Sequence, residues 1–343
     1  MKKLIYKTLI SGAMLTLLAS CHKEDTPEPD AVLPIAASAE QFQELRKQAL
    51  EELMQTETFN AEDGIAFTSA EGAQVYLSPG SLLDEDDNPV TGEVTLSFIE
   101  LYDRGSMVVA NKPLMGRNPV NGTLEPLVTG GQYYIEVKQD EDMLKTAYPF
   151  TVRVPTAPTG GVDVDMILWD GEIDDDGNLV WTETDEEDGD LLLEEVEVFD
   201  DPDNPESSIG QLVGDYYDTW HRDFGWINCD RFWRDPRPKT SVDVTVPAGF
   251  GNENCAVYLA FEGEPNVLAQ LYDPTGDSFF SYNGEGFPIG LTVHVIFTSE
   301  RDGDFLYTIK TTTVQADVMI TIAADELKTA TKDQLTDLVN ALY

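Results

Sequence analysis

Two short runs of sequence indicate the fold class: GAQVYLSPGS at residues 72–81 and NPVTGEVTL at residues 88–96. Apolar and polar side chains alternate within them, with Val75 and Leu77 on one side and Tyr76 on the other, which is typical of a β-strand with one buried face. The prolines and glycines that separate the alternating residues favour tight turns. The stretch therefore predicts short antiparallel strands joined by turns.

The same alternation recurs along most of the chain. It predicts strands at residues 94–101, 133–137, 150–154, 162–169, 179–182, 225–232, 240–246, 256–261, 291–298, 305–310 and 318–322. Capping-box spacing begins at Ser38 and at Thr331, and apolar residues follow each at helical intervals, so we expect a helix of about 18 residues first and a short helix last. The expected fold is mainly β, with two antiparallel β-sandwich domains, an N-terminal helix and a short C-terminal helix.

The run PTAPTGG at residues 155–161 is the best candidate for a linker, because prolines and glycines replace any periodic apolar face. We therefore expect the helix and the first sandwich at residues 38–157 and the linker at residues 158–161. The second sandwich is expected at residues 162–343, with an acidic insertion at 172–210 and the C-terminal helix.

The two runs quoted first resemble the ZU5-like β-sandwich module of Bacteroidota surface-type lipoproteins. That module has an alternating strand, a proline-glycine or proline-alanine turn, and then Asp-x-x-Gly-x-Pro-Val-x-Gly-x-Val. Here Asn88 stands in place of the usual turn glycine and Ser81 in place of the usual alanine. The resemblance extends to about Pro155 and reappears in GWINCD at residues 225–230. It implies a β-sandwich fold and an envelope location, and it carries no activity with it.

The N-terminus has the order of a secretory signal. Lys2, Lys3 and Lys7 precede an apolar run at residues 9–19, which is too short to cross a bilayer as a permanent helix. Leu18-Ala19-Ser20 directly before Cys21 resembles the lipobox of bacterial lipoproteins. We therefore expect a signal peptide at residues 1–20 and lipid on Cys21, and two or more acyl chains hold a protein stably at a membrane.

The residues after Cys21 are polar and rich in proline, so residues 21–37 are expected to form a flexible tether. Lys23-Glu24-Asp25 resembles the signal by which Bacteroidota send lipoproteins to the outer face of the outer membrane. The expected location is the outer membrane, facing the cell exterior, and the alternative is its periplasmic face.

The chain is strongly acidic, with 64 Asp and Glu against 21 Lys and Arg and a formal net charge of -43. Such a field repels nucleic acid, so a nucleic-acid partner is not expected. The ordinary role of this charge is solvation, and attraction of cations is the alternative.

Only Cys229 and Cys255 remain once Cys21 is lipidated, and in an oxidising compartment such a pair can form a disulfide. Two independent buried thiols are the alternative. Zinc is not expected, because two cysteines and distant histidines do not supply four ligands with suitable spacing.

The acidic run from 172 to 183 matches part of a calcium loop. Its oxygen-bearing residues occupy the ligand positions of an EF-hand-like loop, with Gly177 at the sharp turn: Glu172, Asp174, Asp176, Asn178 and Glu183. Against calcium, the flanking residues are typical of strands rather than helices. A plain Asp-Gly hairpin turn between Trp169 and Trp181 is the alternative.

Tryptophan and arginine concentrate between residues 220 and 234, in a chain that is otherwise acidic. Trp226, Trp233 and Arg234 are the candidate ligand face, because aromatic faces stack on sugar rings and guanidinium groups bind carboxylates bidentately. The ligand would be a glycan or an envelope protein. Burial of both tryptophans in the core is the alternative, since 225–232 has the alternation of a strand.

None of the usual catalytic signatures occurs in the sequence, including metalloprotease, nucleophile-elbow, phosphate-loop and dinucleotide motifs. We therefore expect no enzyme activity, no catalytic residues and no cofactor other than calcium. The expected function is a membrane-anchored, non-catalytic binding or interaction module of the bacterial envelope. The alternatives are a carboxylate-dependent enzyme acting on glycans and a structural envelope protein.

Overall fold

A computed structural model describes residues 36–174, 177–184, 210–272, 278–281 and 286–342. The expected signal peptide, Cys21, nearly all of the tether and most of the acidic insertion lie outside these residues. The described part is mainly β, with a helix at each end and several antiparallel sheets, as the alternation of the sequence predicts.

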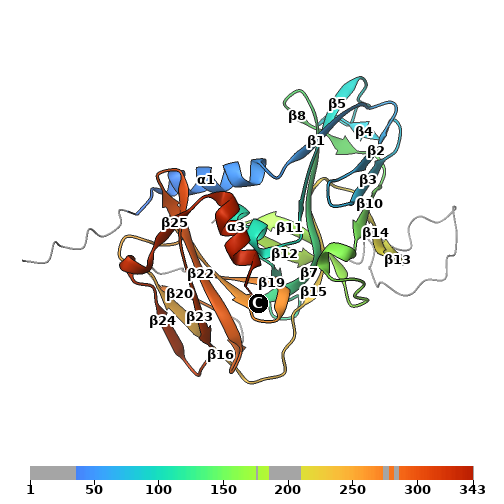
Figure 1. The fold of residues 1–343 in the computed structure, drawn as a ribbon. Coiled ribbons are helices and arrows are strands. Elements are labelled where there is room, and N and C mark those ends of the chain that lie inside the picture. The colour runs from blue at the N-terminus through green and yellow to red at the C-terminus, as the bar shows by residue number, and fades with distance from the viewer. Residues whose placement is uncertain (1–35, 175–176, 185–209, 273–277, 282–285, 343) are drawn as a thin grey trace, which may run out of the picture. The chain divides into compact units, whose positions relative to one another are not determined.

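The first β-sandwich-like region pairs two sheets (Figure 1). The larger has eight strands, in the order β1-β5-β7-β15-β11-β12-β6 with β8 beside β7. Its strands are β1 (Gln55–Asn60), β5 (Glu93–Leu101), β6 (Met115–Arg117), β7 (Leu124–Gln139), β8 (Asp142–Met143), β11 (Ile167–Ile173), β12 (Leu179–Glu183) and β15 (Gly225–Phe232).

The sheet opposite has five strands, in the order β13-β14-β10-β3-β2. These are β2 (Ile65–Thr68), β3 (Gln74–Leu77), β10 (Phe150–Pro155), β13 (Gly210–Val213) and β14 (Tyr216–His221). A short pair, β4 (Leu82–Leu83) and β9 (Lys145–Thr146), lies outside both sheets, and the turn η1 (Ala157–Thr159) follows β10.

The second region is built from the last hundred residues of the chain. Its five-stranded sheet has the order β19-β18-β22-β23-β25, its three-stranded sheet the order β20-β17-β24, and β16 pairs β21. The strands are β16 (Lys239–Thr240), β17 (Val242–Thr245), β18 (Cys255–Phe261), β19 (Glu264–Leu271), β20 (Ser278–Phe280), β21 (Phe287–Pro288), β22 (Thr292–Arg301), β23 (Asp304–Thr313), β24 (Val318–Thr321) and β25 (Lys328–Ala330).

Among the described residues, three α-helices pack beside these sheets: α1 (Ala39–Glu51), α2 (Arg104–Ala110) and α3 (Lys332–Asn340). The capping boxes predicted at Ser38 and Thr331 are both present and start α1 and α3, although α1 has 13 residues rather than about 18. The sequence did not predict α2, which lies against α3 (Figure 1). None of the helices in the described residues is long and apolar enough to span a membrane.

Five strands of the larger sheet close into a ring, because β6 pairs both with β12 and with the start of β7. Leu127, Trp169, Trp181 and Trp226 come from four different strands of this ring and pack in one hydrophobic cluster. Closure leaves these strands without an unpaired edge. Gly171 makes the packing possible, since a Cβ there would lie 2.7 Å from the Trp181 ring.

Strand β18 shows how the two regions share their cores, because it is buried on both faces. Val257 and Leu259 face one cluster, the sandwich core, which also contains Val75, Phe98 and Tyr133 of the first region. The alternate residues of β18, Ala256, Tyr258 and Ala260, face a second cluster, the helix-side core, which the three helices and the ring also line.

The boundary predicted at residues 158–161 does not divide the sheets. Strands β11, β12 and β15 follow it in sequence but pair into the sheet of β7, and β14, which also follows it, pairs with β10. The first region therefore extends to about Trp233, and the second begins near Lys239. The correction has a physical reason: strand pairing depends on hydrogen bonds between distant segments, whereas a linker motif reports only local backbone preference.

Candidate functional site

The candidate ligand face around Trp226 and Trp233 is mostly interior. Each of these two side chains is only 9% exposed, Trp226 in the helix-side core and Trp233 in the sandwich core. Arg234 is exposed at the end of the segment. The two indoles therefore do not form an exposed face with Arg234, and core packing, the alternative interpretation, describes their placement.

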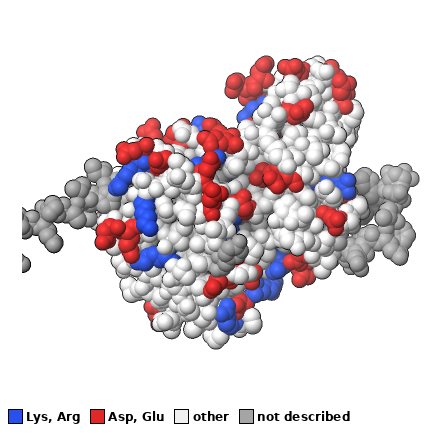
Figure 2. All heavy atoms as spheres, in the orientation of Figure 1, with Lys and Arg blue, Asp and Glu red and all other residues white. Residues whose placement is uncertain are grey.

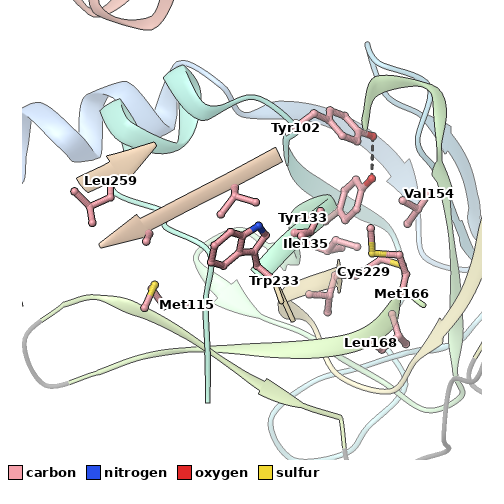
Figure 3. Close-up of a cluster of buried hydrophobic side chains, with 14 of the residues drawn as sticks. Tyr102, Met115, Tyr133, Ile135, Val154, Met166, Leu168, Cys229, Trp233 and Leu259 are labelled. Carbon is pink, nitrogen blue, oxygen red and sulfur yellow. Dashed lines mark hydrogen bonds between the residues drawn. The ribbon is translucent and has the colours of Figure 1, made fainter. Parts of the chain in front are cut away.

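Trp233 lies where the two regions meet (Figure 3). Its ring centroid is 4.7 Å from that of Phe261, and Figure 3 shows it between Ile135 of the first region and Leu259 of the second. The backbone N–H of Trp233 donates to the carbonyl of Pro126 at 2.8 Å. The residue thus belongs to the contact between the regions rather than to a surface.

The run from 172 to 183 forms the hairpin that was the alternative to a calcium loop. Glu172 pairs with Val180 and Glu183 with Trp169, which places the two glutamates at different points of the hairpin. The N–H of Asn178 donates to the Asp174 carboxylate at 2.8 Å, so this carboxylate closes the turn. Asp176 lies outside the described residues, and no group of three metal-ligating side chains occurs among those described.

Cys229 and Cys255 are both buried thiols and form no disulfide with each other. Cys229 lies on β15 in the eight-stranded sheet, and Cys255 begins β18 in a different sheet. The predicted bond is therefore absent from the structure, and two independent buried thiols, the alternative, describe these residues. Burial, with a smaller contribution from Asp230, raises the pKa of the Cys229 thiol well above its ordinary value.

A cavity of about 260 Å³ lies between the α1 helix, the 172–183 hairpin and strands β18 to β20. Its walls are lined by Arg46, Arg117, Leu124, Asp174, Asn178, Val180, Asn252, Cys255, Ala256, Gln270, Leu271, Tyr272 and Phe279. Arg117 is exposed and Leu271 is fully buried, so the cavity extends from the surface into the core. Concave sites with an apolar lining and a few polar groups are the usual place for small ligands.

Two guanidinium groups line this cavity. Arg46 is held on α1 with its guanidinium carbon 4.1 Å from the centre of the Phe42 ring, one turn earlier on the helix. Arg117 donates to the carbonyl of Gly122 at 3.3 Å. Within the described residues neither forms an ion pair with a carboxylate, whereas Arg153 and Arg231 do.

A chain of polar groups crosses the cavity wall from the hairpin to β19. Asn178 accepts a hydrogen bond from the Gln270 amide at 3.2 Å and donates to Asp174. Gln270 is 6% exposed, and its carbonyl oxygen Oε1 has no hydrogen-bond partner in the described residues. A buried polar atom left without a partner costs about 1–3 kcal/mol of stability.

The charge near Arg46 is positive, in contrast to the chain as a whole. Lys112 is buried with its ammonium 5.2 Å from the Trp226 ring, and burial, followed by repulsion from Arg46, lowers its pKa to about 8. Burial likewise lowers the pKa of Arg46, although a guanidinium remains charged at neutral pH. Elsewhere Figure 2 shows acidic side chains spread over the face drawn.

Neither a family model nor a curated protein matches the chain. The chemistry of the cavity is therefore inferred from its own side chains. Two of them, Asp174 and Asn178, are among the candidate calcium ligands that the sequence pattern indicates. Arg46, Arg117 and Gln270 are not predictable in this way, because an arginine on a surface helix or a glutamine in a strand carries no local signal of a site.

Proposed function

We propose that the protein is a non-catalytic binding module of the bacterial envelope, held to the outer membrane by lipid on Cys21. The 260 Å³ cavity is its binding site, and this cavity is the observation that carries the proposal. Binding rather than catalysis is favoured by the composition of its walls. Asp174 is the one carboxylate among its described lining residues, whereas hydrolysis of a glycosidic bond ordinarily requires two.

Filling the cavity tests the site. Leu124 lines it and is only partly buried, so Leu124→Trp should occupy the space at modest cost to the fold. Leu338→Trp is the matched control, because Leu338 is 42% exposed on α3 and outside the cavity. Each protein is immobilised and exposed to a panel of neutral and acidic envelope polysaccharides, and both retention and products are measured.

We expect retention of at least one polysaccharide by the wild-type protein and by Leu338→Trp, loss of retention in Leu124→Trp, and no shortened product. Release of shortened product would instead support the carboxylate-dependent enzyme. Equal retention by Leu124→Trp would place the site elsewhere. An absence of retention by all three proteins would favour a structural envelope protein.

The anchor has a separate test. Cys21→Ala removes the proposed lipid acceptor and leaves the apolar leader intact. We expect this variant to leave the membrane fraction, because a leader that is cleaved or too short holds no stable anchor. Membrane retention at the wild-type level would contradict the lipid anchor. Protease added to intact cells then distinguishes the outer face, where the protein is digested, from the periplasmic face.

A further inference from the structure

We infer that the cavity binds a carboxylate-bearing ligand of monosaccharide size, an acidic sugar whose carboxylate is held by the guanidinium groups of Arg46 and Arg117. This inference rests on the proposed function and names the chemical class of its ligand. Three features of the cavity support it independently: the charge of its walls, a buried amide oxygen without a partner, and its apolar side.

The charge is the first feature. The chain has a net charge of -43, and eight of its described Lys and Arg side chains form ion pairs, whereas Arg46 and Arg117 form none within the described residues. Both line the same cavity, whose described lining contains a single carboxylate, that of Asp174. Two guanidinium groups can hold a carboxylate through charge-assisted and bidentate hydrogen bonds, which are stronger than neutral ones.

The amide of Gln270 is the second feature. This side chain is 94% buried by area, since only 6% is exposed, and its Oε1 atom lacks a partner while its nitrogen donates to Asn178. Buried polar groups in proteins are nearly always paired. A ligand hydroxyl in the cavity that Gln270 lines would supply the missing donor, and sugars carry several hydroxyl groups.

The apolar side of the cavity is the third feature. Val180, Leu271 and Phe279 are buried and contribute carbon surface to its wall. An apolar face suits the C–H face of a pyranose ring, and an aromatic ring can stack on it. At about 260 Å³ the cavity is smaller than the roughly 300–1,000 Å³ of sites for drug-sized ligands, so it accommodates one sugar residue.

The experiment compares sugars that differ only in the carboxylate. The full chain, purified in detergent, is titrated by calorimetry with galacturonate, its methyl ester and galactose, and with glucuronate and glucose. The variants are Arg46→Gln and Arg117→Gln, with Arg234→Gln as the matched control because Arg234 is exposed and lies outside the cavity. Melting temperatures establish that each variant is folded, and Arg117 is exposed enough that its replacement should not disturb the core.

We expect the wild-type protein to bind galacturonate or glucuronate at least tenfold more tightly than the matched neutral sugar or ester. Arg46→Gln and Arg117→Gln should each weaken acid binding by roughly tenfold or more, since a hydrogen bond to a charged group is lost. Arg234→Gln should bind as the wild type does.

Two results would overturn the inference. Equal affinity for acidic and neutral sugars, unchanged in both arginine variants but lost in Leu124→Trp, would leave the binding module in place and exclude the acidic ligand. The acidic ligand would also be excluded, with the binding module still in place, if none of these sugars bound while the wild type retained a polysaccharide that Leu124→Trp did not retain. If retention also fails, the proposed function fails together with the inference.

Discussion

His221 shows how one buried side chain ties stability to pH. It is 8% exposed, and its Nε2 lies 2.8 Å from the Thr219 hydroxyl, which donates its own hydrogen to the carbonyl of Val152. The imidazole must therefore donate from Nε2 and is neutral in the fold. Burial lowers its pKa from 6.5 to about 3.

The sign of the effect follows from this lowered pKa. As pH falls below 6.5 the unfolded chain protonates His221 while the folded chain does not, so this contribution to stability is lost towards pH 3. We expect the free energy of unfolding of the wild type to fall relative to that of His221→Gln, by at most about 1.4 kcal/mol per pH unit. Urea denaturation of both proteins between pH 7 and pH 4 measures this difference. Free energies of unfolding that change in parallel with pH in the two proteins would contradict the prediction.

Trp233 and Arg234 are neighbours with opposite roles. Trp233 fills the contact between the two regions, so Trp233→Ala should lower the free energy of unfolding by about 3–5 kcal/mol. Arg234 is exposed, and Arg234→Ala should change the free energy of unfolding by less than about 0.5 kcal/mol. Chemical denaturation measures the free energy of unfolding of both variants. A Trp233→Ala protein as stable as the wild type would contradict the burial of Trp233 between the two regions.

At the scale of elements, the closest helix contact joins α2 to α3. The N–H of Gly105 donates to the Asn340 side chain at 2.7 Å, and the Asn340 amide donates to Asp103 at 2.6 Å. Arg104 reaches the carbonyls of Phe261 and Leu342. The C-terminal helix is thus fastened to α2, which precedes it by more than two hundred residues.

Gly105 leaves no room for a side chain, because a Cβ there would lie 2.4 Å from the carbonyl oxygen of Thr336. Gly105→Ala should therefore displace α3 and cost about 1–3 kcal/mol of stability. Leu338→Ala, on the exposed side of α3, is the control and should cost far less. Thermal unfolding of both variants checks this, and an unshifted melting temperature for Gly105→Ala would show that α3 does not pack as described.

Features of the fold that are encoded locally are predictable from the sequence. Alternation located β3, β5, β10 and β18 to within a residue or two, and Ser38 and Thr331 gave the helix starts. Helix α2 is not predicted, because it has only seven residues and is fixed by its caps, Asp103 at the start and Asn111 in the left-handed conformation at the end.

Features that depend on pairing between strands far apart in the chain could not be predicted from the sequence. Nothing local in β7 indicates that its partner, β15, begins about a hundred residues later, and the linker-like run between them suggested a boundary instead. The cavity is similar, because Arg46, Arg117, Asn178 and Gln270 come from four separate elements and meet only in the folded chain. Single-sequence patterns report periodicity and caps, whereas these sites require the topology.

At the scale of the whole molecule, two sheets contain strands from both sides of residues 158–161, so truncation at that point should disrupt both sheets. A fragment of residues 36–161 keeps β7 and β10 but loses β15 and β14, so the central strands of two sheets become unpaired edges. We expect this fragment to be unfolded or aggregated and residues 36–343 to unfold cooperatively. Circular dichroism melting compares them, and a cooperative transition in the fragment would restore the boundary at 158–161.

The proposed binding cavity also belongs to the whole molecule, since the first region supplies Arg117 and Asn178 and the second supplies Gln270 and Phe279. The most direct test of its role is a crystal structure of the protein soaked with galacturonate. We expect the sugar in the cavity, with its carboxylate within hydrogen-bond distance of the Arg46 or Arg117 guanidinium and a hydroxyl on Gln270. A sugar bound only elsewhere, or a cavity that stays empty at saturating galacturonate, would contradict the assignment of this cavity as the binding site.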